Sequence, residues 1–261
     1  MAVLAVVLVS FIAPSLEPSD SDFDAFVDAA FTQPLPFIVN MLALIALVPV
    51  SWVSARRWGT LQSTEGHFRW SYARSTLVPA LVVAITANLI ITGLAYASGD
   101  VKIEFTIQTW IMLGLAALLL PFQSYAEELM FRGWLPQLLG QWVKNAFVVY
   151  SLPILLFTWG HYYNLAGLID IAVFASCMSF LTRNTGGIEA AAVIHAIRNL
   201  FFFTIGSIGI IDLSNTEISW QIALLNSAMT ISTTAWVYFA VRRGSGRTDA
   251  PAPSPSAQMP R

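Results

Sequence analysis

Charged residues are scarce in this chain. Asp, Glu, Lys and Arg make up 11% of its 261 residues, whereas hydrophobic residues make up 56%. So few polar side chains cannot cover the surface of a water-soluble globule of this size, and the composition therefore predicts a membrane protein. The formal net charge is −2 and no block of basic residues stands out, which argues against nucleic-acid binding.

Cysteine is nearly absent as well, because Cys177 is the single cysteine in the sequence. An internal disulfide is therefore excluded, and the position of Cys177 inside an apolar run favours a buried thiol. The apolar residues 1–13 lack the Lys or Arg that precedes the core of a secretory signal peptide. We interpret them as a short first helix, with an incorrectly assigned start as the alternative.

Long apolar runs are what the sequence has in abundance. A helix that crosses the bilayer needs roughly 17 to 20 apolar residues, and runs of about this length cover residues 37–55, 76–98, 105–123, 146–163, 165–181, 188–207 and 219–241. With residues 1–13 they predict an all-α fold, a polytopic transmembrane helical bundle of seven or eight spans. We expect residues 1–243 to form one integral membrane domain and the Pro- and Ser-rich residues 244–261 to be a disordered cytoplasmic tail.

The charged loops predict the orientation of the chain in the membrane. Short loops rich in Arg and Lys stay in the cytoplasm, and four arginines crowd the loop between the second and third hydrophobic segments, Arg56, Arg57, Arg69 and Arg74. Following the chain from this loop, basic and acidic loops alternate, so the acidic residues 100–104 and 212–217 are expected outside. The same alternation places the C-terminus in the cytoplasm.

Ionisable residues within the apolar segments are few. Each costs roughly 2.5 to 3.5 kcal/mol in hydrocarbon even on the lenient insertion scale, so such residues usually face the bundle interior and have a function. With the uncharged Asn199 beside them, they are Glu127, Glu128, Arg132, His161, Asp170, Glu189, His195 and Arg198.

The first pattern among these residues is the sequence Glu-Glu-Leu-Met-Phe-Arg at positions 127–132. Glu128 and Arg132 are four residues apart, share a helical face and are expected to pair. Glu127 points about 100° away, which is the rotation per residue of an α-helix, and has no cation built in beside it. A carboxylate that is not held in a salt bridge suits the role of a general base.

Two further patterns use two of the three histidines in the chain. Phe157 precedes His161 by one helical turn, and His195 precedes Asn199 by the same spacing, so each pair shares a face. The simpler alternative is that the first pattern is a topology anchor and that the histidines are packed, hydrogen-bonded residues that link helices. We interpret Asp170, Glu189 and Arg198 as structural.

Taken in this order on successive hydrophobic segments, the three motifs resemble the CPBP family of intramembrane endopeptidases, the CAAX proteases and bacteriocin-processing enzymes also labelled Abi. The resemblance covers about residues 105–207. It implies a cavity inside the membrane, reached from the cytosolic side, and hydrolysis of a peptide bond without a covalent intermediate. By similarity Glu127 and His161 would activate a water, His195 and Asn199 would stabilise the oxyanion, and Glu128 and Arg132 would brace the site.

A metal-dependent site is the alternative chemistry. Glu127, His161 and His195 could hold a zinc ion with an open position for water. The HExxH spacing that places both histidines and the base on one helix is absent, however, and Asn199 is a poor zinc ligand. We therefore expect hydrolysis without a metal cofactor.

Two other classes of function remain open at this stage. Glu, His and Arg inside a bundle also describe the proton relay of a proton-coupled transporter, and a non-catalytic scaffold or immunity protein could hold a peptide in the same cavity. The expected partners are the lipid bilayer and a membrane-associated or lipidated peptide or protein. The motifs do not distinguish a prenylated C-terminus from a bacteriocin-like peptide or a sorting signal. The distribution of the family implies a bacterial inner membrane.

Overall fold

The computed structural model describes residues 25, 28–55, 59–99, 101 and 103–245, and the regular elements of this part of the chain are helices. Its only strand-type pairing is an isolated bridge between Ser63 and Gly187. In chain order the elements are α3 (Pro34–Ile45), α4 (Leu47–Ser54), α5 (Gly59–Gln62), α6 (Trp70–Ser98), α7 (Ile107–Glu128), the π-helix η1 (Leu129–Trp134), α8 (Leu135–Leu139), α9 (Ala146–Trp159), α10 (Leu165–Thr185), α11 (Glu189–Ser207) and α12 (Trp220–Ser245).

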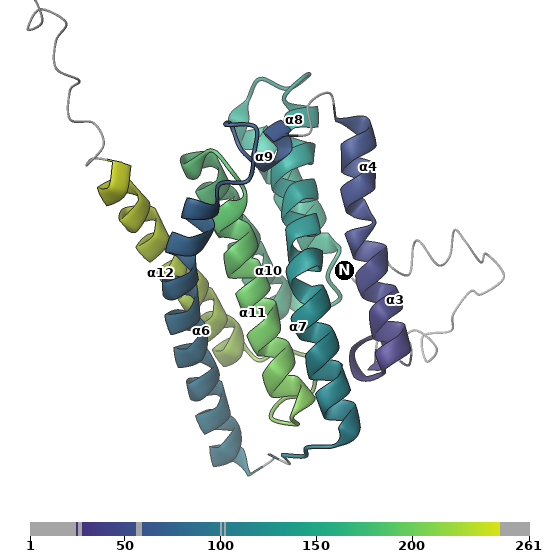
Figure 1. Ribbon diagram of the computed structural model, residues 1–261. Helices are drawn as coiled ribbons and strands as arrows, with labels where there is room; N and C mark the ends of the chain where they lie inside the picture. The colour runs from purple at the N-terminus through teal and green to yellow at the C-terminus, as the bar shows by residue number, and fades with distance from the viewer. Residues whose placement is uncertain (1–24, 26–27, 56–58, 100, 102, 246–261) are drawn as a thin grey trace, which may run out of the picture.

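The helices form one bundle around α7 and α11 (Figure 1). These two helices lie side by side at its centre, with α3 and α4 on one flank and α6 and α12 on the other. α10 packs against α12 and α9, and α7 continues without interruption through η1 into α8. The predicted all-α helical bundle is therefore confirmed.

Among the described residues, five stretches are long and apolar enough to cross a membrane by length and composition, namely Pro34–Ser54, Trp70–Ser98, Ile107–Leu139, Leu165–Thr185 and Glu189–Ser207. The helix α9 starts where the run 146–163 predicts, and Asn145 caps this start. It is shorter than the run because it ends before Gly160. α12 is long but contains many Asn, Ser and Thr residues. Residues 1–13 and the tail 246–261 lie outside the described residues, so the number of spans stays a prediction.

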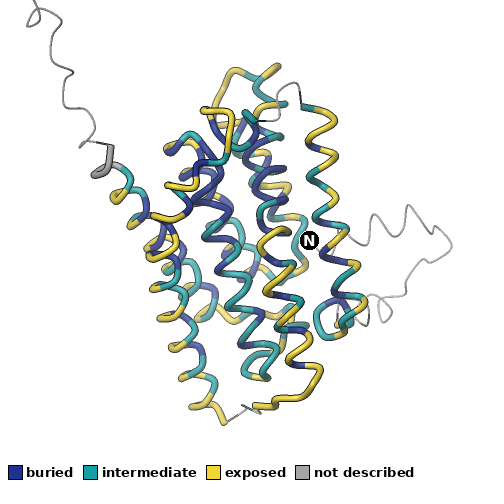
Figure 2. The backbone as a smooth tube through the Cα atoms, viewed as in Figure 1, coloured by how far each residue is buried: buried dark blue, intermediate teal, exposed yellow. Residues whose placement is uncertain are grey.

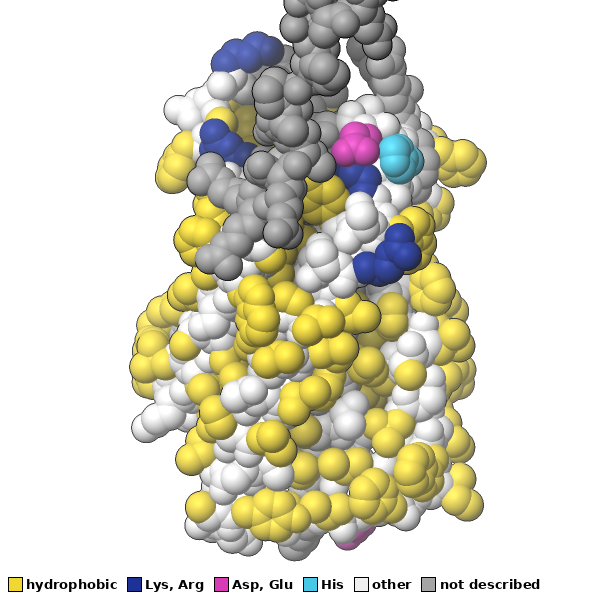
Figure 3. Space-filling view, turned by 60° about the vertical axis from the view of Figure 1, so that its left-hand side comes forward, with side chains coloured by type: hydrophobic (Ala, Val, Ile, Leu, Met, Phe, Trp, Pro, Cys, Tyr) yellow, Lys and Arg dark blue, Asp and Glu magenta, His cyan; other side chains and the backbone are white. Residues whose placement is uncertain are grey.

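The two ends of the bundle differ in charge. Gln137 donates a hydrogen bond to the carbonyl of Thr60, and Ser63 pairs with Gly187. The segments that carry Arg69, Lys144 and Arg183 therefore meet at one end of the bundle, here called the basic end. At the opposite end, the backbone N–H of Glu104 donates a hydrogen bond to the carbonyl oxygen of Ile208. On the face in Figure 3 most charged side chains gather at one end, and the rest of that surface is mainly apolar.

Burial is concentrated where α7, α10 and α11 meet (Figure 2). One apolar cluster joins α10 and α11 around Phe174 and Met178, and a second joins α3 to α7 around Phe37 and Met112. Many large apolar side chains point outward instead, and Ile107 is 80% exposed. An apolar exterior around a polar interior is what a bilayer requires, and the chain is an integral membrane protein.

Candidate active site

Glu127 and Glu128 are the last residues of α7 and are almost fully enclosed, with exposures of 1% and 0%. The helix widens into the π-helix η1 directly after them. Single π-turns inside α-helices often occur at functional sites, because the extra residue changes the direction in which neighbouring side chains point. The helix is thus irregular where the two carboxylates lie.

Glu128 is the acceptor for two cationic or potentially cationic side chains. Its Oε1 lies 3.1 Å from Arg132 Nη1, which confirms the predicted pair, and 2.7 Å from His195 Nδ1. A carboxylate can only accept, so the proton of this second bond lies on Nδ1 of the imidazole. The contact between Glu128 and His195 was not predicted, because it joins residues 67 positions apart.

Glu127 has no arginine or lysine partner among the described residues, as its position on the helix predicted. Its Oε1 accepts a hydrogen bond from Gln123, one turn earlier in α7. Its Oε2 is buried without a hydrogen-bond partner in the part of the chain that the structure describes, and it lies 3.7 Å from His195 Nε2. The imidazole of His195 is therefore placed between the two carboxylates.

His161 follows the end of α9 and is not part of the helix, contrary to the expectation that it lies inside the span. Gly160 ends the helix, and the His161 ring then packs on Phe157 with a centroid separation of 4.8 Å. His161 Nδ1 lies 2.7 Å from the carbonyl oxygen of Phe157. Because a carbonyl only accepts, Nδ1 carries the proton, and Nε2 of the neutral ring keeps its lone pair.

Asn199 is bonded to α7 in this arrangement. Its Nδ2 donates to Gln123 Oε1 at 3.2 Å and to Ser124 Oγ at 3.3 Å. Gln123 therefore connects Glu127 with Asn199, since it donates to the first and accepts from the second. Sequence reasoning missed Gln123, although a glutamine four residues before Glu127 in an otherwise apolar helix was the available signal.

The four residues predicted to be catalytic line one cavity, here called the Glu127 cavity. Glu127, His161, His195 and Asn199 all contribute to its wall. The rest of the wall comes from α3, the start of α10, and the loop at residues 213–216. The four groups come from three parts of the chain, and the fold brings them together.

An ion pair joins the start of α6 to the start of α11 at the basic end, and the expected entrance from the cytosolic side stays a prediction. No described residue of the basic-end loops is among those that line the Glu127 cavity. Arg69 forms a bidentate salt bridge with Glu189, in which Nε and Nη2 each lie 2.8 Å from a carboxylate oxygen. Both side chains are buried. The hydrogen bonds to Glu189 raise the pKa of Arg69 above its ordinary value, although burial opposes this. Glu189 is therefore structural, as interpreted, and its partner is Arg69.

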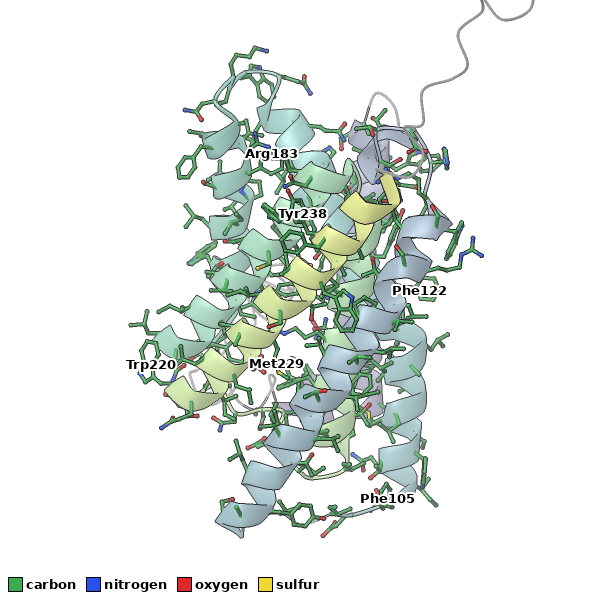
Figure 4. All side chains as sticks on the ribbon, turned by 90° about the vertical axis from the view of Figure 1, so that its left-hand side faces the viewer. Phe105, Phe122, Arg183, Trp220, Met229 and Tyr238 are labelled. Carbon is green, nitrogen blue, oxygen red and sulfur yellow. The ribbon has the colours of Figure 1, made fainter. Side chains whose placement is uncertain are left out.

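A second cavity adjoins the first and is here called the α6–α12 cleft. Figure 4 shows α12 crossing α6 obliquely, with Met229 on the α12 side. The cleft is lined by residues of α6, α10, α11 and α12, and it shares His161, Arg198 and Asn199 with the Glu127 cavity. Arg198 pairs with Asp170, which also accepts from Ser227 at 3.1 Å. This ion pair joins three helices one turn from His195.

The expectation that hydrolysis proceeds without a metal cofactor stays a prediction. In the residues 25 to 245 that are described, no three His, Cys, Asp or Glu side chains form a group that could hold a metal ion. His195 Nδ1 and His161 Nδ1 are both engaged with oxygen acceptors. The arrangement of these side chains is therefore that of a hydrogen-bonded network.

One more polar residue faces the Glu127 cavity and was not singled out from the sequence. Asn40 of α3 lines the cavity and is 5% exposed, and its Oδ1 is buried without a hydrogen-bond partner in the described chain. It lies outside the three motifs. An asparagine within the otherwise apolar run 37–55 was the only sign of it in the sequence.

Comparison with known proteins supports the identification made from the motifs. A family model described as "Type II CAAX prenyl endopeptidase Rce1-like" matches residues 106–201, which contain all six predicted site residues, and the predicted family resemblance is confirmed. The chain is also similar to YyaK of Bacillus subtilis (strain 168), an uncharacterized protein, with 28% identity over 189 residues, or 67% of this chain. The match covers 62% of that relative's length. No solved structure matches the chain.

Proposed function

We propose that the protein is an intramembrane endopeptidase. The premise is that its residues 106–201 match the family model described as "Type II CAAX prenyl endopeptidase Rce1-like". The protein hydrolyses a peptide bond of a membrane-associated or lipidated substrate near the cytosolic side of the membrane. The observation that carries the proposal is that Glu127, His161, His195 and Asn199 line one cavity. In an apolar bundle, buried ionisable groups that converge in this way are typical of a functional site.

Glu127 is the general base in this proposal. Its Oε2 is free of hydrogen bonds within the described chain and can take a proton from a water molecule. The oxygen of that water then attacks the carbonyl carbon of the scissile bond. His161 assists, because its Nε2 lone pair can accept a hydrogen bond from the same water.

The negative charge that develops on the carbonyl oxygen needs hydrogen-bond donors. His195 can donate from Nε2 when that nitrogen carries a proton, and its Nδ1 is held by Glu128. Asn199 adds its amide NH2 once the substrate displaces its bonds to Gln123 and Ser124. Each such donor is worth about 2.7 to 4 kcal/mol of transition-state stabilisation in other hydrolases. When the C–N bond breaks, Glu127 returns its proton to the leaving amine.

Glu128 and Arg132 stabilise this arrangement without reaching the substrate. Arg132 balances the charge of Glu128, and Glu128 in turn holds His195 Nδ1. Arg132 is also fixed by the ring of Phe157, whose centroid lies 4.3 Å from its Cζ. A site with balanced charge is less costly to bury than an unpaired carboxylate.

The experiment that tests the proposal compares membranes carrying the wild type or Glu127→Gln. Both are incubated with a library of prenylated and unprenylated peptides, and the cut bonds are identified by mass spectrometry. We expect Glu127→Gln to lower the cleavage rate by at least about 100-fold, the lower range for loss of a general base, while the protein stays folded in the membrane.

The control is Glu104→Gln, the same change at an exposed carboxylate of the opposite end, which should cleave at the wild-type rate. Equal cleavage by Glu127→Gln and wild type would refute the assignment. A parallel sample treated with a chelator tests the proposal that no metal takes part, because cleavage should then continue unchanged.

A further inference from the structure

Asn40 is a buried amide whose oxygen is not used in a hydrogen bond within the described residues. Its Oδ1 has no partner among the described residues, and its side chain is 95% enclosed by the surrounding structure, since only 5% is exposed. A buried polar group without a partner destabilises the fold, because it has given up its hydrogen bonds to water. Such a group in a membrane helix usually pairs with a neighbouring helix, so the missing partner needs an explanation.

The surroundings of Asn40 are those of the proposed site. α3 packs on α7 through Phe37, Met41 and Leu44, whose partners in α7 include Leu120. Asn40 lines the Glu127 cavity together with Leu120, Gln123 and Glu127. It therefore faces the same space as the groups that would carry out the reaction, from a helix outside the three motifs.

A peptide that is to be hydrolysed inside the membrane must leave the helical conformation around the scissile bond. Its backbone N–H and C=O groups then lose their internal partners, and in an apolar environment each unsatisfied group costs several kcal/mol. The cavity wall must supply replacements. The amides of Gln123 and Asn199 are bonded to each other, whereas Oδ1 of Asn40 has no partner among the described residues.

The chemistry of Asn40 matches this need. A side-chain amide carries one acceptor and two donors, the same groups that a peptide unit presents. It is also neutral, so it neither repels Glu127 nor forms an ion pair that would remove the base from the reaction. An acidic side chain at this position would repel Glu127, and a basic side chain would form an ion pair with it.

We propose that Asn40 binds the backbone of the substrate peptide, with Oδ1 accepting a peptide N–H, and so holds an extended segment between α3 and the α7–α11 pair. This inference rests on the proposed function, because it takes a peptide as the ligand of the Glu127 cavity. It adds a binding residue from outside the segment 106–201 that matches the family model.

The test measures binding and stability separately. A fluorescently labelled S-farnesyl peptide with a free three-residue C-terminal extension is titrated into the purified full chain carrying Glu127→Ala, so that no turnover occurs. Adding Asn40→Leu should weaken the affinity by about five- to tenfold, the effect of losing one hydrogen bond. The same Asn40→Leu change should leave the thermal unfolding temperature equal or higher, because it removes an unpartnered polar group.

The matched control is Asn184→Leu, the same substitution at an exposed position of α10, which should change neither quantity. An unchanged affinity in the Asn40→Leu protein, or a lower unfolding temperature, would overturn the proposal, since the second result would show that Asn40 is needed by the fold itself. If Asn40→Leu weakens binding but the wild type does not cut the peptide, the proposed hydrolysis fails and the role of Asn40 stands.

Discussion

Glu128 contacts more of the proposed site than any sequence pattern indicated. The motif predicted its pair with Arg132, and the structure adds His195, which is bonded to the same carboxylate oxygen. One side chain thus neutralises a buried arginine and sets the orientation of an imidazole. Its neighbour Glu127 is left with one oxygen that has no partner among the described groups, and the two adjacent glutamates consequently have different roles.

Arg132→Leu is expected to destabilise the protein strongly. The substitution leaves Glu128 a buried carboxylate that has lost its permanent cation, and breaking a buried pair in this way costs about 3 to 5 kcal/mol. The double variant Glu128→Leu with Arg132→Leu should recover most of that loss, because no uncompensated charge remains, yet it should be inactive, because His195 has lost its acceptor. Thermal unfolding in detergent, combined with the cleavage assay, measures both effects.

The control for these variants is Arg74→Leu, which removes an exposed arginine at the start of α6 and should change stability little. If the double variant were as unstable as Arg132→Leu, the coupling between the two side chains would be absent. Cleavage by the double variant at the wild-type rate would show that Glu128 does not position His195.

At the scale of the elements, η1 is the irregular feature on which the site depends. Gly133 lies within it, and a Cβ at this position would overlap the carbonyl oxygen of Leu61. The neighbour is backbone and cannot move aside as a flexible side chain would. Glycine is therefore required here by the close approach of α5 to the π-helix.

Gly133→Ala should lower the free energy of unfolding by about 1 to 3 kcal/mol, the usual effect of overpacking. The matched control is Gly114→Ala in the preceding helix α7, where a Cβ would meet open space. Because alanine favours a helix over glycine by about 1 kcal/mol, the control should be neutral or slightly stabilising. Equal effects of the two substitutions in a chemical or thermal unfolding experiment would contradict this account of η1.

The positions of the helices were predictable from the sequence where the length of an apolar run alone determines them. Long apolar runs fixed α6, α7, α10 and α11 to within a few residues, because a bilayer demands both length and apolarity. The expectation for His161 was wrong in one respect, since Gly160 ends α9 before it. The π-helix was not predicted, because the apolar pattern of the sequence does not distinguish it from the α-helix that it continues.

The site was predictable only in part, for a related reason. Spacing within one helix revealed the Glu128–Arg132 pair and left Glu127 without a cation. The bonds of Glu128 to His195, of Gln123 to Asn199 and of Arg69 to Glu189 join distant parts of the chain. No periodicity within a helix reports on such contacts, and the motifs alone suggested only that these residues meet.

For the molecule as a whole, the separation of charge predicts the topology. Single cysteines are introduced in a Cys177→Ala background at Lys144, Arg183, Glu104 and Asp212, and intact cells are treated with a membrane-impermeant thiol reagent. We expect positions 104 and 212 to be labelled from outside, and positions 144 and 183 to be labelled only after lysis, because basic loops stay in the cytoplasm. Labelling of positions 144 and 104 from the same side would contradict the orientation.

The bond between Arg69 and Glu189 joins residues 120 positions apart, and it clamps the start of α11, the helix that carries His195 and Asn199. During synthesis the two glutamates of α7 emerge and insert well before this clamp can close. The newly made chain therefore passes through a stage in which its acidic half of the site is present and its imidazole half is missing. An enzyme of the proposed kind, assembled in this order, has no complete active centre until most of its own polypeptide has been delivered to the bilayer.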